Sequence, residues 1–322
     1  MSLRKSLFVT VVLVTWLAGG LQYALTESTP SMPRMSKVIT VTTFDPAYLQ
    51  LTEGLAIDKE GSIYVGFYLT GQIWKITPQG EHSIFATLDV SGSVGGGLVG
   101  FALDEEGDLY VCDASGEPAT HGIWKVERSG ASRLFAALDP TGFPNAIALD
   151  KAGNLFVTDS YLSEIWKISP SGEAKVLLQD PLLAPVFAYG ANGIEFDVGA
   201  LFVANTDQGT ILRIKLGDDD RPRRPEVFVQ SPALVGADGI AFDVRHNLYV
   251  AVDYQNTLVR VGPDGEITTL ATVSDGLDFP ASTSFGQSRG RRKFLFWTNG
   301  GYNFAKPSLQ KLDVGVPGIP LP

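Results

Sequence analysis

One short pattern occurs six times in the sequence at nearly constant spacing. The copies are TEGLAID (52–58), LVGFALD (98–104), PNAIALD (144–150), ANGIEFD (191–197), ADGIAFD (237–243) and a degenerate PASTSFG (280–286). Successive copies start 46, 46, 47, 46 and 43 residues apart. A period of this length indicates a repeat architecture, in which every unit has the same supersecondary structure.

Each copy continues through three further apolar segments in the same order. In the first unit these are IYVGF (63–67), QIWKI (72–76) and SIFATL (83–88), separated by turns rich in Gly, Pro and acidic residues. Four short strands joined by such turns are typical of one blade of a β-propeller. We therefore predict an all-β chain whose residues 37–322 form one six-bladed β-propeller, with four antiparallel strands in each blade.

The sixth unit contains only three of the four expected strands and ends in LQKLDVGVPGIPLP (309–322). The missing strand has a candidate at the other end of the propeller, KVITVTTF (37–44). If this N-terminal strand completes the last blade, the ring closes and leaves no open sheet edge at the join.

The first 30 residues differ from the rest of the chain. Arg4 and Lys5 precede an apolar stretch over 6–25, as in an export signal. The stretch is also just long enough to span a bilayer, so a retained N-terminal anchor is the alternative. We expect a protein exported to the periplasm or the extracellular space, with membrane contact only through this segment if it is not cleaved.

The charge and cysteine content exclude some partners and bonds. The net charge is −10, so we expect no nucleic-acid partner, because phosphates would be repelled. Cys112 is the only cysteine, which excludes an intramolecular disulfide, and its place in LYVCDA predicts a buried thiol. We expect a monomer.

The second residue of each copy occupies the same place in every blade. The innermost strands of a propeller surround a central channel, so we expect these six positions to converge at one end of it. We call them the ring residues: Glu53, Val99, Asn145, Asn192, Asp238 and Ala281. In four blades a glycine follows, which lets the backbone pass close to the axis.

Four ring residues carry oxygen donors, and none carries a positive charge. Two carboxylates that converge without a cation raise each other's pKa. Ca²⁺ resolves this conflict, because it accepts carboxylate and amide oxygens at roughly 2.3–2.6 Å. Another divalent cation remains open, although zinc is disfavoured because the ring has no His or Cys. The alternative interpretation is that these polar residues only cap strand starts at a water-filled channel mouth.

The six units, with Glu, Asn, Asn and Asp in blades one, three, four and five, resemble the senescence marker protein/gluconolactonase superfamily. Diisopropyl fluorophosphatase and the paraoxonases share that architecture, and the resemblance covers residues 37–315. It implies that Glu53, Asn145, Asn192 and Asp238 bind a catalytic calcium and that the substrate is a lactone, an ester or an organophosphate. Either Glu53 or Asp238 would orient or deprotonate a water molecule, or Asp238 would attack as a nucleophile.

Two features depart from the family pattern. Blade two has Val99-Gly100 where the sugar-lactonase members have polar residues, which predicts a substrate less polar than gluconolactone. The paraoxonases are associated with a histidine near the calcium. The candidate here is His121, in the loop DASGEPATHG (113–122), and the alternative is an exposed loop histidine with no catalytic role.

The loops on the same side as the ring residues carry several aromatic side chains. DPLLAPVFAYG (180–190) is either a substrate wall or a packed loop. We expect the substrate pocket to be lined by Val99, Tyr161, Phe187, Tyr189, Tyr254 and Tyr302, with Phe67 and Tyr68 as further candidates. The polar residues that end second strands are expected to cap turns: Asp113, Asp159, Asn205 and Asn299.

Two other functional classes remain open. One is a non-enzymatic propeller of the NHL type, which binds a partner through its rim. The other is a strictosidine-synthase-like enzyme that needs no metal. Fold alone does not decide between these classes and a calcium-dependent hydrolase.

Overall fold

The computed structural model describes residues 37–90, 97–217 and 221–321. The predicted export signal or anchor (1–30) lies outside the described residues. The chain divides into two units, and Ser36–Pro322 is the unit that contains all strands of the described residues. None of the helices within the described ranges is long and apolar enough to cross a membrane.

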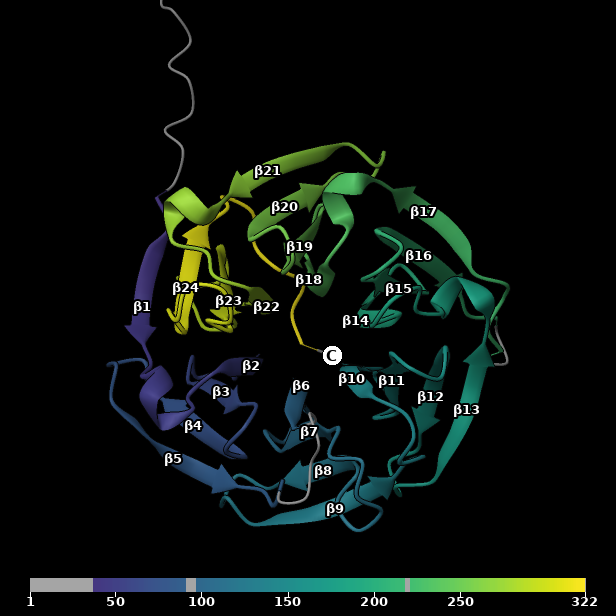
Figure 1. The fold of residues 1–322 in the computed structure, drawn as a ribbon, viewed down its shortest axis with the longest axis horizontal. Coiled ribbons are helices and arrows are strands. Elements are labelled where there is room, and N and C mark those ends of the chain that lie inside the picture. Colours follow the sequence, from purple (N-terminus) through teal and green to yellow (C-terminus); the bar gives the residue numbers. More distant parts are fainter. Residues whose placement is uncertain (1–36, 91–96, 218–220, 322) are drawn as a thin grey trace, which may run out of the picture. The chain divides into compact units, whose positions relative to one another are not determined.

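The propeller unit is a ring of six antiparallel four-stranded sheets, as predicted (Figure 1). From the inside outwards, blade one is β2 (Thr52–Ile57), β3 (Ile63–Phe67), β4 (Gln72–Ile76) and β5 (His82–Thr87). Blade two is β6 (Leu98–Leu103), β7 (Leu109–Asp113), β8 (Gly122–Val126) and β9 (Ser132–Ala137). Blade three is β10 (Pro144–Leu149), β11 (Leu155–Asp159), β12 (Glu164–Ile168) and β13 (Ala174–Gln179).

Blades four to six follow the same order. Blade four is β14 (Ala191–Asp197), β15 (Ala200–Asn205), β16 (Thr210–Lys215) and β17 (Glu226–Gln230). Blade five is β18 (Ala237–Phe242), β19 (Leu248–Val252), β20 (Thr257–Val261) and β21 (Ile267–Ala271). Blade six is β22 (Pro280–Phe285), β23 (Phe294–Asn299), β24 (Ser308–Asp313) and β1 (Ile39–Thr43). Short 3-10 helices, η1 (Pro46–Tyr48), η2 (Pro181–Leu183), η3 (Pro232–Leu234) and η4 (Val273–Asp275), precede four of the inner strands.

The N-terminal strand closes the ring, as the sequence predicts. β1 pairs antiparallel with β24 as the outermost strand of blade six (Figure 1). The next residue, Phe44, is buried and packs edge to face on Phe67 and Trp74 of blade one, with ring centroids 5.0 and 6.1 Å apart. One segment therefore completes the last sheet and packs against the first.

The glycines that follow the ring residues let neighbouring inner strands approach closely. A Cβ at Gly54, Gly100, Gly193 or Gly239 would lie 2.4, 2.2, 2.1 or 2.5 Å from the backbone oxygen of the next blade's ring residue. Real Cβ atoms do not come this close, so only glycine fits without displacing the neighbouring strand. This close approach draws the ring residues together around the axis.

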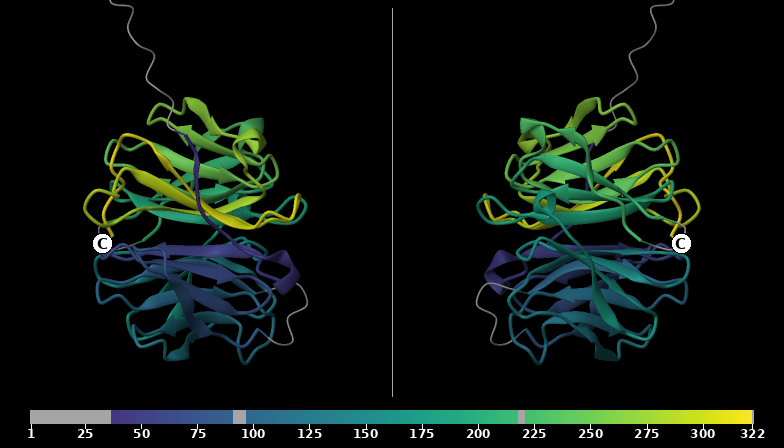
Figure 2. Two further views of the ribbon diagram at one scale, coloured as in Figure 1. Left: turned by 90° about the vertical axis from the view of Figure 1, so that its left-hand side faces the viewer. Right: turned by 90° about the vertical axis from the view of Figure 1, so that its right-hand side faces the viewer.

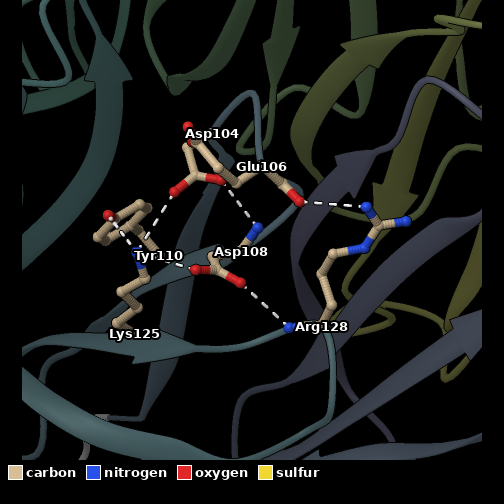
Figure 3. A network of polar contacts seen from close by, with 6 residues as sticks. All are labelled: Asp104, Glu106, Asp108, Tyr110, Lys125 and Arg128. Atoms are coloured by element: carbon tan, nitrogen blue, oxygen red, sulfur yellow. Dashed lines mark hydrogen bonds and ion pairs between the residues drawn. The ribbon is translucent and has the colours of Figure 1, made fainter.

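In four of the six blades, the aspartate that ends the repeated pattern caps the turn at the other end of the inner strand. Asp58, Asp104, Asp150 and Asp243 each accept a backbone N–H from the residue four positions later, at 2.7–3.0 Å. In blade two, Lys125 joins this turn through ion pairs to Asp108 (2.9 Å) and Asp104 (3.4 Å), as Figure 3 shows. The aspartate that ends the repeated pattern therefore has a structural role.

The C-terminal segment covers the end of the channel that is remote from the ring residues. Gly318 N–H donates to the Arg292 carbonyl (2.8 Å), and Ile319 N–H donates to the Phe242 carbonyl (3.0 Å). Figures 1 and 2 show this segment reaching the middle of one face of the propeller. Leu321 lines the part of the channel that is remote from the ring residues. This part is a cavity of ≈ 120 Å³, which Glu195 also lines. The ring residues thus open on the opposite face.

We expect Glu195 to make the stability of the fold depend on pH. Burial raises the pKa of its carboxyl from an ordinary 4.5 to about 7, against the hydrogen bond from Phe196 N–H. The folded state then holds a proton that the unfolded chain releases, so stability falls as pH rises from about 4.5 to about 7. We expect Glu195→Gln to flatten the decline of the melting temperature between pH 5 and pH 8. The exposed Glu60→Gln is the control, and parallel curves for wild type and Glu195→Gln would contradict the assignment.

Candidate functional site

The ring residues meet at one cavity of ≈ 290 Å³. All four predicted oxygen donors line it, together with Val99; Ala281 is buried beside it without lining it. The full lining is Glu53, Tyr68, Val99, Phe143, Asn145, Tyr189, Asn192, Asp238, Asp253, Phe279 and Tyr302. The repeat thus brings together side chains that lie up to 185 positions apart, from Glu53 to Asp238.

The two asparagine side chains are oriented by hydroxyl groups of the residues that directly follow the second strands. Asn145 Nδ2 donates to Ser160 Oγ, and Asn192 Nδ2 donates to Thr206 Oγ1, both at 3.0 Å. Each hydroxyl donates its own proton to a backbone carbonyl of the next blade, at 2.6 Å for Ser160 and 2.8 Å for Thr206. The hydroxyl oxygen is therefore the acceptor of the hydrogen bond from the asparagine amide. The amide nitrogens are thereby fixed at the hydroxyls, and the amide oxygens are left for the cavity.

Asn192 Oδ1 is a buried acceptor without a hydrogen-bond partner within the described residues. An unpaired buried oxygen costs about 1–3 kcal/mol, which a ligand at this place would recover. An amide oxygen held without a donor is suited to a cation rather than to a second acceptor. Asn192 is therefore the ring residue whose environment most directly indicates a bound cation.

The carboxylates of the cavity lack a counter-charge. Burial, then the charge of Asp238, raises the pKa of Glu53 well above its usual range, while a hydrogen bond from Tyr302 opposes the rise. Burial raises the pKa of Asp238 to about 7. Among the side chains described, no Lys, Arg or His lines the cavity. A divalent cation would relieve both carboxylates at once.

The donor set fits calcium better than a transition metal. It combines two carboxylates with two amide oxygens, which is hard-ligand chemistry. In the described ranges no group of three or more His, Cys, Asp and Glu side chains is placed to hold a metal, so any metal site here depends on the asparagines. Glu53, Asn145, Asn192 and Asp238 are the residues that would hold the ion.

The aromatic residues predicted for the pocket divide into two groups. Tyr189 and Tyr302 line the cavity, as does Tyr68. Tyr161 and Tyr254 do not line it and stand at its rim, 44% and 43% exposed, in contact with Tyr189 (ring centroids 5.7 Å apart) and Phe279 (6.4 Å) respectively. Phe67, by contrast, is buried in the core under Phe44.

The loop 180–190 is both a packed loop and a cavity wall. The Asp207 carboxylate accepts backbone N–H groups from all four residues 186–189, at 2.6–3.1 Å. Within this loop, Leu183 is buried and Tyr189 lines the cavity. Phe187 is 89% exposed and does not line the cavity, so its prediction as a pocket residue is wrong.

His121 is buried rather than exposed and does not line the cavity. Its Nδ1 accepts the Gly116 N–H at 3.0 Å, which ties together the loop between β7 and β8. Burial lowers the pKa of the imidazole, so the neutral form is favoured. Nothing in this placement brings it to the ring residues.

The residues expected to cap turns do so. Asp159 Oδ1 accepts three backbone N–H groups, including that of Phe143 at 2.9 Å. Asp113 accepts the Ser115 N–H, Asn205 bonds the backbone at Leu182, Ala184 and Gln208, and Asn299 accepts the Asp278 N–H. Cys112 is buried, as predicted.

Three cavity residues escaped the sequence prediction: Phe143, Phe279 and Asp253. A signal existed for each of them. Phe143 and Phe279 each precede the proline that begins an inner strand. Asp253 follows the second strand of blade five, at the position that Ser160 and Thr206 occupy in blades three and four.

Comparison with known proteins is informative only at the level of structure. Sequence comparison matches no family model and no curated protein. A gluconolactonase from Xanthomonas campestris aligns with a TM-score of 0.65 and 16% identity, over 88% of this chain and 90% of that one. A calcium-binding regucalcin from Agrobacterium tumefaciens gives 0.65 and 16%, over 88% and 95%. The chain has the gluconolactonase-like fold.

That fold is the one implied by the resemblance to the senescence marker protein/gluconolactonase superfamily, which is thereby confirmed at the level of architecture. A structure of similar architecture also belongs to an enzyme of another reaction class. Virginiamycin B lyase from Staphylococcus aureus aligns with a TM-score of 0.59 and 18% identity, over 82% of this chain and 80% of that one. Function must therefore be argued from the cavity.

Proposed function

We propose that this protein is a calcium-dependent hydrolase of a lactone or an ester, with organophosphates as a further substrate class. The observation that carries the proposal is the donor set of the cavity. Two buried carboxylates and two oriented amide oxygens converge there, and Asn192 Oδ1 has no partner among the described residues. This arrangement is costly unless a cation occupies it.

The chemistry follows from the residues of the cavity. Bound calcium would polarise the substrate carbonyl or phosphoryl oxygen. In one route, either Glu53 or Asp238 accepts a proton from the attacking water. In the alternative route, Asp238 itself attacks the substrate as a nucleophile. Tyr302 donates a hydrogen bond to Glu53 and thus orients it, and burial keeps the pKa of this phenol high enough for it to remain a donor.

The other walls favour a substrate with limited polarity. Val99, Phe143 and Phe279 present apolar surface, and Tyr68 and Tyr189 add largely apolar rings. The cavity of ≈ 290 Å³ has room for a small organic molecule. We therefore expect small lactones and aryl esters to be better substrates than a hydroxylated sugar lactone.

The proposal is tested with a panel of lactones, aryl esters and phosphotriesters, assayed in EDTA and again after calcium is restored. We expect at least one class to be hydrolysed, with activity that disappears in EDTA and returns with calcium. Mass spectrometry of the product identifies the reaction, because hydrolysis adds a water and elimination does not. Turnover that persists in EDTA would favour a metal-independent enzyme, and no turnover with any substrate would favour a binding propeller.

The hydroxyl that orients Asn192 provides a second test. Thr206→Val removes the acceptor of Asn192 Nδ2 but leaves the charge of the ring unchanged. Loss of such an outer-shell partner typically costs roughly 10–100-fold in metal affinity, which calcium calorimetry would measure. Thr210→Val in the next strand is the matched control, since that buried hydroxyl has no partner within the described part of the chain. Equal calcium affinities for the two variants would refute the orienting role.

A further inference from the structure

The cavity has one carboxylate more than a divalent cation neutralises. Glu53, Asp238 and Asp253 all line it, and no basic side chain of the described residues does. Asp253 is 4% exposed, and one of its oxygens accepts the N–H of Tyr254. Burial, and then the charges of Asp238, Glu53 and Asp207, raise the pKa of Asp253 well above its usual range. With calcium on the ring residues, the carboxylate of Asp253 still has no counter-charge among the side chains that line the cavity.

A purely supporting role does not account for Asp253. In blades three and four the same position holds Ser160 and Thr206, which hydrogen-bond the ring residue of their own blade. In blade five the ring residue is Asp238, and Asp253 lines the same cavity, so this position carries a second carboxyl where blades three and four have a neutral hydroxyl. Like charges that share one buried cavity destabilise the protein when no cation is bound. A bound ligand with a positive charge would compensate this cost and would account for the carboxylate at this position.

Two clusters of aromatic rings contribute side chains to the lining of the cavity that Asp253 shares. Phe143, Tyr161 and Tyr189 form one cluster, with centroid distances of 5.1–5.7 Å. Tyr254, Phe279 and Tyr302 form a second cluster beside Asp253, with centroid distances of 4.8 and 6.4 Å. The faces of aromatic rings attract cations, and aromatic walls around an acidic group are a known means of holding ammonium ions.

We propose that the cavity binds a substrate carrying an ammonium group, which Asp253 and the rings of Phe279 and Tyr302 hold beside the metal. The inference rests on the proposed calcium site, because calcium must take up the charges of Glu53 and Asp238. The substrate class is then a lactone or ester with a cationic amine. Such a substrate has both the apolar bulk that the walls accept and the charge that Asp253 lacks.

The test compares choline with 3,3-dimethylbutan-1-ol, its uncharged analogue of the same shape. Both are titrated by calorimetry into the protein at saturating calcium, so that the ring residues are occupied. We expect choline to bind roughly tenfold or more tightly than the alcohol. Asp253→Asn should abolish this preference, and Phe279→Leu should reduce it. Asp139→Asn, an exposed carboxyl on the same face, should leave it intact.

Circular dichroism and thermal melting establish that each variant is folded, and calcium titration without choline gives the metal stoichiometry. Equal binding of choline and the alcohol to the wild type, or a preference that survives Asp253→Asn, would overturn the proposal. So would two calcium ions in the wild type and one in Asp253→Asn, because Asp253 would then be a metal ligand. Absence of any calcium binding would overturn the proposed function as well, whereas calcium binding without choline preference overturns only this inference.

Discussion

Glu53→Gln and Asp238→Asn are each expected to lower calcium affinity by roughly 100-fold or more and to reduce hydrolysis to background. Loss of an outer-shell partner alone typically costs 10–100-fold, and these residues would contact the ion directly. Each substitution also removes one of the two charges that the ring residues supply. The shape of the side chain is nearly unchanged, so the effect reports the charge and the donor set.

Calorimetric calcium titration and the lactone and ester assays measure this outcome in parallel. Glu117→Gln is the matched control, because it makes the same chemical change on an exposed loop of the same face, away from the cavity. We expect it to retain wild-type calcium affinity and activity. If Glu53→Gln and Asp238→Asn keep both properties, the assignment of the metal site is wrong.

Removal of the N-terminal strand is expected to prevent folding of the propeller. A chain that starts at Asp45 lacks β1, so β24 presents an unpaired edge and blade six has three strands. It also lacks Phe44, which packs in one cluster with Leu55, Val65 and Phe67. Loss of a buried phenylalanine alone costs about 3–5 kcal/mol, a large share of the usual stability of a domain.

A chain that starts at Lys37 is the control, because it retains every described strand. Thermal melting followed by circular dichroism, together with size-exclusion chromatography, distinguishes the two chains. We expect cooperative melting of the longer chain, and an aggregated or non-cooperative shorter one. Cooperative melting of the shorter chain at the same temperature would show that ring closure by β1 is dispensable. Phe44→Ala separates the packing contribution from the strand pairing.

Much of the architecture follows from the periodicity of the sequence. The six copies of one pattern specify the number of blades, and the incomplete sixth unit predicts closure by residues 37–44. The same periodicity predicts that Glu53, Asn145, Asn192 and Asp238 converge, because equivalent positions in a closed ring surround one axis. All four line one cavity in the structure.

The loops were less predictable, because they have no common period and their course depends on long-range hydrogen bonds. Asp207 directs residues 186–189 so that Tyr189 enters the cavity and Phe187 points to solvent. His121 is buried because its own loop folds back on its Nδ1. Neither outcome follows from local composition.

The repeat in the sequence thus specifies blade number, strand order, ring closure and the convergence of four oxygen donors. Only the folded chain shows how the amides are oriented, since Ser160 and Thr206 act on Asn145 and Asn192 from neighbouring strands. Only the folded chain adds Asp253 to the cavity between aromatic walls from several blades. The physical reason is that a period specifies equivalent backbone positions, whereas charge balance and side-chain orientation depend on contacts between segments far apart in the chain.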